Sequence, residues 1–181
     1  MKTKGFIRVN NLIVFLSKTI DMRKNELRIV HFEFDDLSEL ESEDQKLVLT
    51  ARQASENAYA PYSNFLVGAA LMLENGEIVT GNNQENAAYT NGLCAERVAL
   101  FHANANHPGA AVQTLAITAQ NSSGLVPEPV KPCGSCRQAI VETEVRFKKP
   151  IRIILDGKNS IRIFEGVDNL LPFAFKPDSL D

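Results

Sequence analysis

Two short stretches decide how this chain is organised: Cys94-Ala95-Glu96-Arg97 and Pro132-Cys133-Gly134-Ser135-Cys136-Arg137. Together they hold all three cysteines of the 181-residue sequence. A thiol with a carboxylate two residues on, followed by a Cys-x-x-Cys pair, is typical of a catalytic zinc site with three protein ligands and one open position. We therefore predict one zinc ion bound by Cys94, Cys133 and Cys136, with Glu96 as the acid/base group beside it.

Both clusters fall where helices are predicted to begin, over about residues 94–105 and 133–145. The N-terminus of a helix carries partial positive charge and favours thiolate over thiol. Three thiolates nevertheless leave a Zn²⁺ centre negatively charged, and therefore a poor Lewis acid, so further positive charge is needed. We expect Arg97 or Arg137 to supply it by donating hydrogen bonds to the sulfurs.

Two alternatives are buried free thiols and a closed, structural zinc site completed by a histidine. None of His31, His102 and His107 has the short spacing of a zinc finger. His102 would lie two helical turns beyond Cys94, too far along the helix to bind the same ion. The spacing therefore favours an open catalytic site, and the alternative outside enzymology is a non-catalytic, zinc-stabilised interaction module.

The hydrophobic pattern of the remaining chain predicts an α/β domain. Ser42 and Gln45 form a capping-box pattern ahead of a helix that ends near Tyr59, and Asn75-Gly76 signals a type I′ hairpin. Residues 121–132 are predicted to form a loop. Strands are predicted over residues 27–34, 65–73, 77–80, 114–119, 151–155 and 161–164. We expect a three-layer α/β/α fold with a mixed five-stranded sheet and an extra N-terminal strand. Its first strand pair should be antiparallel, and right-handed crossovers should join the later strands.

Composition limits the classes of function. The sequence is 44% hydrophobic and 23% charged, enough for one domain with an ordinary core. A net charge of −3 argues against a protein that binds a polynucleotide by neutralising its phosphates. No run approaches the ~18 apolar residues of a membrane span. Unpaired cysteines suit a reducing cytoplasm. We therefore expect a cytoplasmic protein with a small-molecule partner and neither nucleic acid nor a membrane.

The N-terminal part is predicted to be an addition to the main domain. Residues 1–41 are assigned as an N-terminal extension and residues 42–181 as the catalytic domain. The apolar run 12–16 is shorter than the ~7 to 15 residues of a secretory signal core. Met22 is an alternative natural start, in which case residues 1–21 are upstream sequence.

Four segments resemble, in family order, segments of the three-cysteine, tetrameric class of cytidine deaminases. The resemblance covers about residues 52–175. It rests on Tyr59-Ala60-Pro61-Tyr62-Ser63-x-Phe65-x-Val67-Gly68-Ala69-Ala70, Asn83-x-Glu85-Asn86-Ala87-Ala88-Tyr89, Cys94-Ala95-Glu96-Arg97 and Pro132-Cys133-Gly134-x-Cys136-Arg137-Gln138. It implies zinc-dependent hydrolytic deamination of cytidine and 2′-deoxycytidine, with release of ammonia and one zinc per subunit. A deaminase of another cytosine nucleoside, such as a nucleoside antibiotic, is the alternative within this chemistry.

The pattern and the resemblance also assign roles around the substrate. Glu96 is expected to move protons from the attacking water to N3 of the cytosine ring and to the departing amine. The backbone N–H of Ala95 is available to O2 of the base. The resemblance implies that Phe65 stacks on the pyrimidine, that Asn83 and Glu85 hold the ribose 3′-hydroxyl, and that Arg97 contacts the thiolates.

The same resemblance implies a homotetramer. In such an assembly Tyr89 and Phe175 are expected at contacts between subunits, with Phe175 reaching the active site of a neighbour. Two departures from the family pattern are Asn91-Gly92-Leu93 ahead of Cys94 and a longer loop over residues 121–131. Access to the site and assembly are therefore the features in which this chain is expected to differ.

Overall fold

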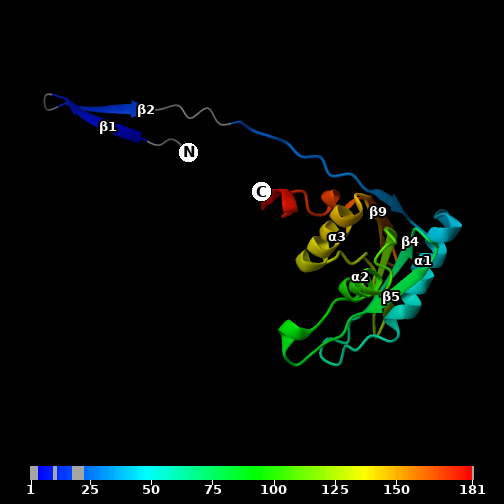
Figure 1. The fold of residues 1–181 in the computed structure, drawn as a ribbon. Helices are drawn as coiled ribbons and strands as arrows, with labels where there is room; N and C mark the ends of the chain where they lie inside the picture. The colour runs from blue at the N-terminus through cyan, green and yellow to red at the C-terminus, as the bar shows by residue number, and fades with distance from the viewer. Residues whose placement is uncertain (1–3, 10–11, 18–22, 181) are drawn as a thin grey trace.

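The computed structural model describes residues 4–9, 12–17 and 23–180, the first two ranges by their backbone alone. A seven-stranded sheet forms the centre, in the order β3-β9-β8-β6-β4-β5, with the short β7 paired to β6 (Figure 1). Its strands are β3 (Phe32–Phe34), β4 (Leu66–Leu73), β5 (Ile78–Asn82), β6 (Val112–Asn121), β7 (Gly124–Leu125), β8 (Arg152–Asp156) and β9 (Ile161–Glu165). The helices are α1 (Ser42–Ser55), α2 (Ala95–Asn106) and α3 (Gly134–Phe147).

Alternation along the strands produces two separate cores. In β6, Leu115 and Ile117 face the core formed with α2 and α3, whereas Ala116 between them faces the core formed with α1. In β8, Leu155 and Ile154 alternate in the same way. Because successive side chains of a strand point to opposite faces, one apolar run serves both cores. The predicted three-layer α/β/α fold with a mixed sheet is thereby confirmed.

The strand connections differ in part from the prediction. The first strand pair, β4 with β5, is antiparallel as predicted, and β6 runs parallel to β8 through the crossover helix α3. β8 and β9, however, are an antiparallel pair joined by a short turn, so the expectation of crossovers throughout the later strands is wrong there. Residues 157–160 are too few for the crossover that a parallel pair needs.

The predicted extra N-terminal strand exists and is shorter than expected. It occupies Phe32–Phe34 instead of residues 27–34, and pairs with β9 in antiparallel register. Two further strands that the sequence did not predict, β1 (Lys4–Val9) and β2 (Leu12–Ser17), pair with each other. The strand β7 likewise forms within the predicted loop 121–132. Short 3₁₀ helices lie at Leu37–Glu39, Tyr89–Asn91, Val167–Asn169 and Pro177–Ser179.

Local turn and cap predictions were partly wrong. At the β4–β5 hairpin only Gly76 has a positive φ, of 83°, so the turn is not type I′, which needs positive φ at both central residues. Helix α1 begins at Ser42, but its N-cap is Glu41 without a side-chain bond, and Gln45 Nε2 donates to Leu40 O at 2.8 Å instead of closing a capping box. The helix ends at Ser55, four residues before the predicted end.

Gly81 of β5 sets how closely α2 can approach the sheet. A Cβ on Gly81 would lie 2.5 Å from Ala99 N and 2.6 Å from Ala95 O, closer than real Cβ contacts allow. The missing side chain therefore lets the first turn of α2, which directly follows Cys94, lie against β5. None of the helices described has the length and apolarity that a membrane crossing requires.

Candidate metal centre

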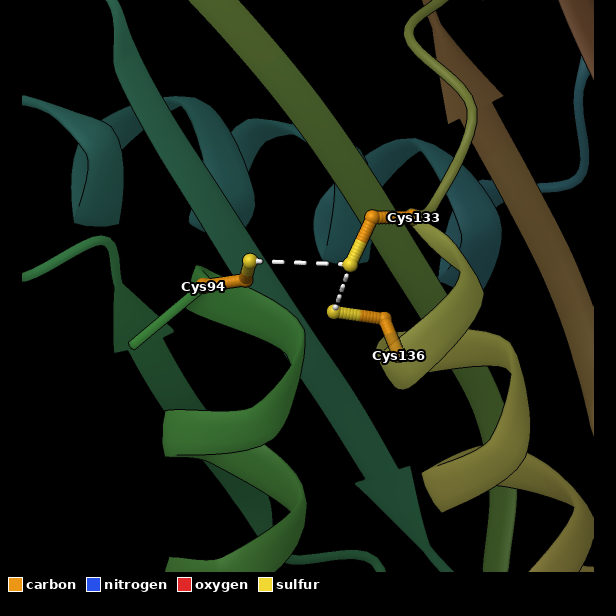
Figure 2. A group of neighbouring side chains, drawn as sticks. All are labelled: Cys94, Cys133 and Cys136. Carbon is orange, nitrogen blue, oxygen red and sulfur yellow. Dashed lines mark hydrogen bonds between the residues drawn. The ribbon is translucent and has the colours of Figure 1, made fainter. Parts of the chain in front are cut away.

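The three thiols converge from the starts of two helices (Figure 2). Cys94 is the N-cap of α2, Cys133 is the N-cap of α3, and Cys136 lies buried in the first turn of α3. The Cys94 and Cys133 sulfurs are 3.8 Å apart, those of Cys133 and Cys136 are 3.4 Å apart, and all three lie within 4.8 Å of one another. A Zn–S bond of ~2.3 Å with tetrahedral angles puts two sulfurs about 3.8 Å apart, so the spacing suits zinc.

The protonation of these thiols also favours a cation. The neighbouring Cys136 thiol, with help from the Arg97 guanidinium, lowers the pKa of Cys94 to about 5. The nearby Cys94 sulfur, together with burial, raises the pKa of Cys136. Deprotonation of Cys94 is thus favoured by its neighbours, whereas deprotonation of Cys136 is disfavoured. A cation bound among the sulfurs is what allows more than one of them to be deprotonated.

Arg97, and not Arg137, reaches a sulfur. Arg97 Nη2 lies 3.8 Å from Cys94 Sγ and 3.4 Å from Gly92 O, and its buried Nε has no hydrogen-bond partner. Arg137 donates instead to two main-chain carbonyls, Pro132 O at 2.8 Å and Leu170 O at 2.7 Å. Of the two arginines expected to offset the thiolate charge, the structure therefore places only Arg97 for that purpose.

Glu96 is an acidic side chain held next to the thiols. It lies in the first turn of α2 and is 4% exposed. Burial raises the pKa of its carboxyl above the ordinary value, and the nearby Cys94 thiolate adds to that shift. A carboxyl with a raised pKa takes up a proton more readily than an ordinary one and can still release it, which is what a proton shuttle requires.

A cavity of about 390 Å³ opens directly onto this group. A volume of this size is in the ordinary range for a small-molecule site. Its walls bring together most of the predicted site residues, namely Asn83, Glu85, Tyr89, Cys94, Ala95, Glu96, Arg97 and Cys133. They also contain residues to which the sequence assigned no role in the site: Val67, Gln84, Asn86, Gly92, Leu93, Val130 and Lys131. Val67 and Asn86 belong to the family-like motifs, Gly92 and Leu93 to the departure ahead of Cys94, and Val130 and Lys131 to the longer loop over residues 121–131.

Two of the predicted polar residues make contacts within the wall itself. The amide of Asn83 bridges the start of β4, since Nδ2 donates to Phe65 O at 2.9 Å and Oδ1 accepts from Val67 N at 2.7 Å. Glu85 Oε2 accepts from Tyr62 N at 2.9 Å and Ser63 N at 3.3 Å. Bonds to Ser63 and Tyr62 hold the pKa of Glu85 below its usual range, so it is a carboxylate at neutral pH.

The predicted aromatic residues lie farther out. Phe65 is half-buried ahead of β4 and is not part of the cavity wall. Tyr89 lines the cavity at its rim and is 82% exposed. Phe175 is 61% exposed, and its carbonyl accepts a hydrogen bond from Gln138 Nε2 at 2.8 Å. Within one chain, therefore, neither Phe65 nor Phe175 encloses the cavity, and their roles stay predictions.

The fold and the centre together define a class: a zinc-binding α/β/α hydrolase with a buried carboxyl group beside its three thiols. Comparison with known proteins narrows this class. Residues 41–149 match the family model of the cytidine and deoxycytidylate deaminase zinc-binding region. The chain therefore belongs to the cytidine and deoxycytidylate deaminase family, and it is a deaminating hydrolase with zinc as its cofactor.

Individual relatives agree with this assignment. The chain is 45% identical to a cytidine deaminase of Sporosarcina psychrophila over 98 residues, which are 54% of this chain and 68% of the relative. It is 37% identical to a cytidine deaminase of Mycobacterium tuberculosis over 133 residues, 72% of this chain and 87% of the relative. The crystal structure of cytidine deaminase from Burkholderia pseudomallei is similar with a TM-score of 0.62 and 38% identity, covering 72% of this chain and 97% of that one.

Proposed function

We propose that this protein hydrolyses the 4-amino group of cytidine and 2′-deoxycytidine, giving uridine or 2′-deoxyuridine and ammonia. The observation that carries the proposal is the buried Glu96 carboxyl, which lies beside three converging thiols in the wall of a nucleoside-sized cavity. The three thiols would hold zinc, and Glu96 would handle every proton of the reaction.

The chain's own groups divide the chemistry between them. Zinc, when bound, supplies the Lewis acidity that makes water a nucleophile near neutral pH. As water attacks C4 of the ring, Glu96 takes the proton that the water gives up and passes it to N3. It then transfers the second proton of that water to the departing amine, so that ammonia leaves as a neutral group. Its raised pKa suits both steps, because the same carboxyl must accept and donate.

The walls of the cavity would orient the nucleoside. The backbone N–H of Ala95 at the start of α2 would bind O2 of the base, where a helix N-terminus favours partial negative charge. Glu85 and Asn83 would hold the ribose 3′-hydroxyl. Both side chains are already fixed by main-chain contacts, so little conformational entropy would be lost on binding. Phe65 would stack on the pyrimidine after a shift toward the cavity.

Assembly is the second part of the proposal. Tyr89, Phe173 and Phe175 are 82%, 89% and 61% exposed, and large exposed aromatic residues favour burial by a partner. We infer a homo-oligomer, a tetramer in the simplest case, in which Tyr89 lies at a subunit contact and Phe175 of one subunit closes the cavity of another. Residues 42–181 would form the catalytic domain of each subunit and residues 1–41 an extension that precedes it.

One assay tests the reaction. Cytidine loses ultraviolet absorbance on deamination, so the purified protein is expected to lower that absorbance, and protein carrying Glu96→Gln is expected not to. Running 2′-deoxycytidine, deoxycytidylate and a cytosine nucleoside antibiotic in parallel separates the competing substrates. A preference for the phosphorylated compound would contradict the proposal, because the Glu85 carboxylate in the wall favours an uncharged sugar.

A further inference from the structure

The N-terminal extension is docked on the sheet by its residues 30–34, which lie ahead of the family match that begins at residue 41. Strand β3 forms a three-residue antiparallel ladder with β9, in which Glu33 lies opposite Arg162. The ring of His31 stacks on Phe164 of β9 with centroids 5.4 Å apart and an interplanar angle of 26°. The extension therefore contacts β9 through both its backbone and its side chains.

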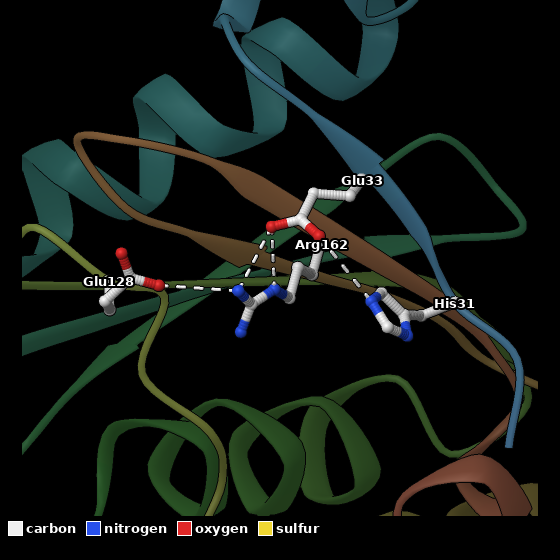
Figure 3. Close-up of polar contacts among 4 residues, drawn as sticks. All are labelled: His31, Glu33, Glu128 and Arg162. Atoms are coloured by element: carbon white, nitrogen blue, oxygen red, sulfur yellow. Dashed lines mark hydrogen bonds and ion pairs between the residues drawn. The ribbon is translucent and has the colours of Figure 1, made fainter.

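Arg162 joins this strand to a second segment (Figure 3). Its Nε and Nη2 both donate to Glu33 Oε1 at 3.1 Å, and Nη2 also donates to Glu128 Oε2 at 3.4 Å. The Arg162 side chain is 24% exposed, less than either carboxylate. One guanidinium on β9 is thus shared between the extension and the segment that contains Glu128.

That segment, residues 126–132, is here named the pocket loop. Its start is fixed by main-chain N–H groups of the β8–β9 turn, which donate hydrogen bonds to Val126 O and Pro127 O, both at 2.9 Å. Arg137 fixes its end at Pro132 O. Among the polar contacts of the described residues, the ion pair of Glu128 is the one made by the middle of the loop, which also packs at the buried Pro129 close to Gly157 of the β8–β9 turn.

The middle of the pocket loop leads directly into the cavity wall. Val130 and Lys131, two and three residues beyond Glu128, line the cavity together with Cys133. Prolines at 127, 129 and 132 fix φ at three of the seven loop positions. A displacement at Glu128 is therefore passed on to Val130 and Lys131 more readily than it is absorbed by a change in backbone dihedrals.

We propose that Arg162 is a positioning residue through which the docked extension holds the pocket loop in place, and that this contact sets how tightly the cavity binds its nucleoside. The kinetic consequence rests on the proposed function. Partly exposed ion pairs contribute little each, so removing this one should raise KM roughly two- to fivefold, with kcat changed by less than about twofold. Zinc content should not change, because no zinc ligand contacts Arg162.

A matched control is available on the neighbouring strand. Arg152 of β8 also binds two carboxylates, Asp44 at 3.0 Å and Glu165, and its side chain is 33% exposed. It makes no polar contact with the pocket loop. Arg162→Gln and Arg152→Gln each remove one charge from the same sheet, but only Arg162→Gln should raise KM. Glu33→Gln combined with Glu128→Gln should raise KM no further than Arg162→Gln, because both pairs share one guanidinium.

Hydrogen exchange supplies a readout that needs no substrate. In the full-length zinc protein, the amides of Glu128, Val130 and Lys131 should exchange faster in Arg162→Gln than in Arg152→Gln or the parent. Equal exchange in the two variants would overturn the link to the loop, and faster exchange without a KM difference would overturn its effect on binding. If exchange is faster in Arg162→Gln but the parent protein does not deaminate cytidine, the proposed function is wrong. The link between the extension and the pocket loop is then still supported.

Discussion

Two polar clusters lie on opposite faces of the sheet. They differ in how many of their hydrogen-bonding groups have partners within the chain. On the α1 face, the fully buried Asp156 accepts from Arg52 Nε and Nη2 at 2.8 Å and from Thr118 Oγ1 at 2.7 Å. On the α2–α3 face, three thiols crowd together and the buried Nε of Arg97 has no partner. The first cluster is complete within the chain, whereas the second requires a cation and a substrate.

The difference teaches how a structural polar group can be told from a functional one. A buried group whose bonds are all made stabilises the fold when intact and has nothing left to offer a ligand. A buried group without partners costs free energy and persists where binding repays that cost. Substitutions in the two clusters should therefore separate activity from stability.

The largest effect is expected at the thiols. Cys133→Ser removes one of three zinc ligands at nearly constant volume, so zinc should fall well below one ion per chain and activity should be almost lost. Metal analysis and the cytidine assay on the same preparation measure both. Ser135→Ala, in the same helical turn, is the control and should keep its zinc. Full zinc and full activity in Cys133→Ser would remove Cys133 from the ligand set.

Glu96→Gln should give the next largest effect. The amide keeps the shape of the side chain and loses the ability to carry a proton, so kcat should fall ~10²- to 10⁴-fold. Zinc content and melting temperature should match the parent, which separates this variant from Cys133→Ser. Activity within a few-fold of the parent would mean that another group moves the proton.

Asp156→Ala should have the opposite profile. The substitution leaves the Arg52 guanidinium without its carboxylate partner. Because Arg52 is one-third exposed, the free energy of unfolding should fall by about 3 kcal/mol, the low end for a broken buried ion pair. Denaturant unfolding measures this loss, while kcat per folded molecule should stay near that of the parent. An unchanged unfolding free energy, or a lost kcat with normal stability, would contradict the division between the two clusters.

The smallest effect is expected at the exposed Phe175. Phe175→Ala should raise KM about two- to tenfold, the value of one aromatic contact, if the ring closes a neighbour's cavity. Mixing these subunits with Glu96→Gln subunits should restore some activity, because a mixed oligomer combines intact parts of each. A fully active monomer by light scattering, or mixtures without any gain, would refute closure by a second subunit.

The sequence predicted the centre of the site well because its determinants are local. Cys94 with Glu96, and Cys133 with Cys136, are set by spacing within a single helical turn, and helix starts follow from short apolar patterns. The α2–α3 face and most strands could be predicted for the same reason.

What the sequence could not predict depends on long-range geometry. Arg52 and Asp156 are 104 positions apart, and nothing in either neighbourhood indicates the other. The entry of Val130 and Lys131 into the cavity depends on where β9 holds the loop. The bonds of the Asn83 amide to the start of β4 depend on the register between β4 and β5.

The close approach at Gly81 has a consequence for variation and for engineering. Even the single methyl group of alanine would meet the backbone of α2 at 2.5 Å, and backbone cannot yield as a flexible side chain can. The helix would have to shift outward, and Cys94, the N-cap residue directly ahead of its first turn, would move with it. In a saturation library scored for metal retention, position 81 should therefore tolerate no replacement, although it contacts neither metal nor substrate.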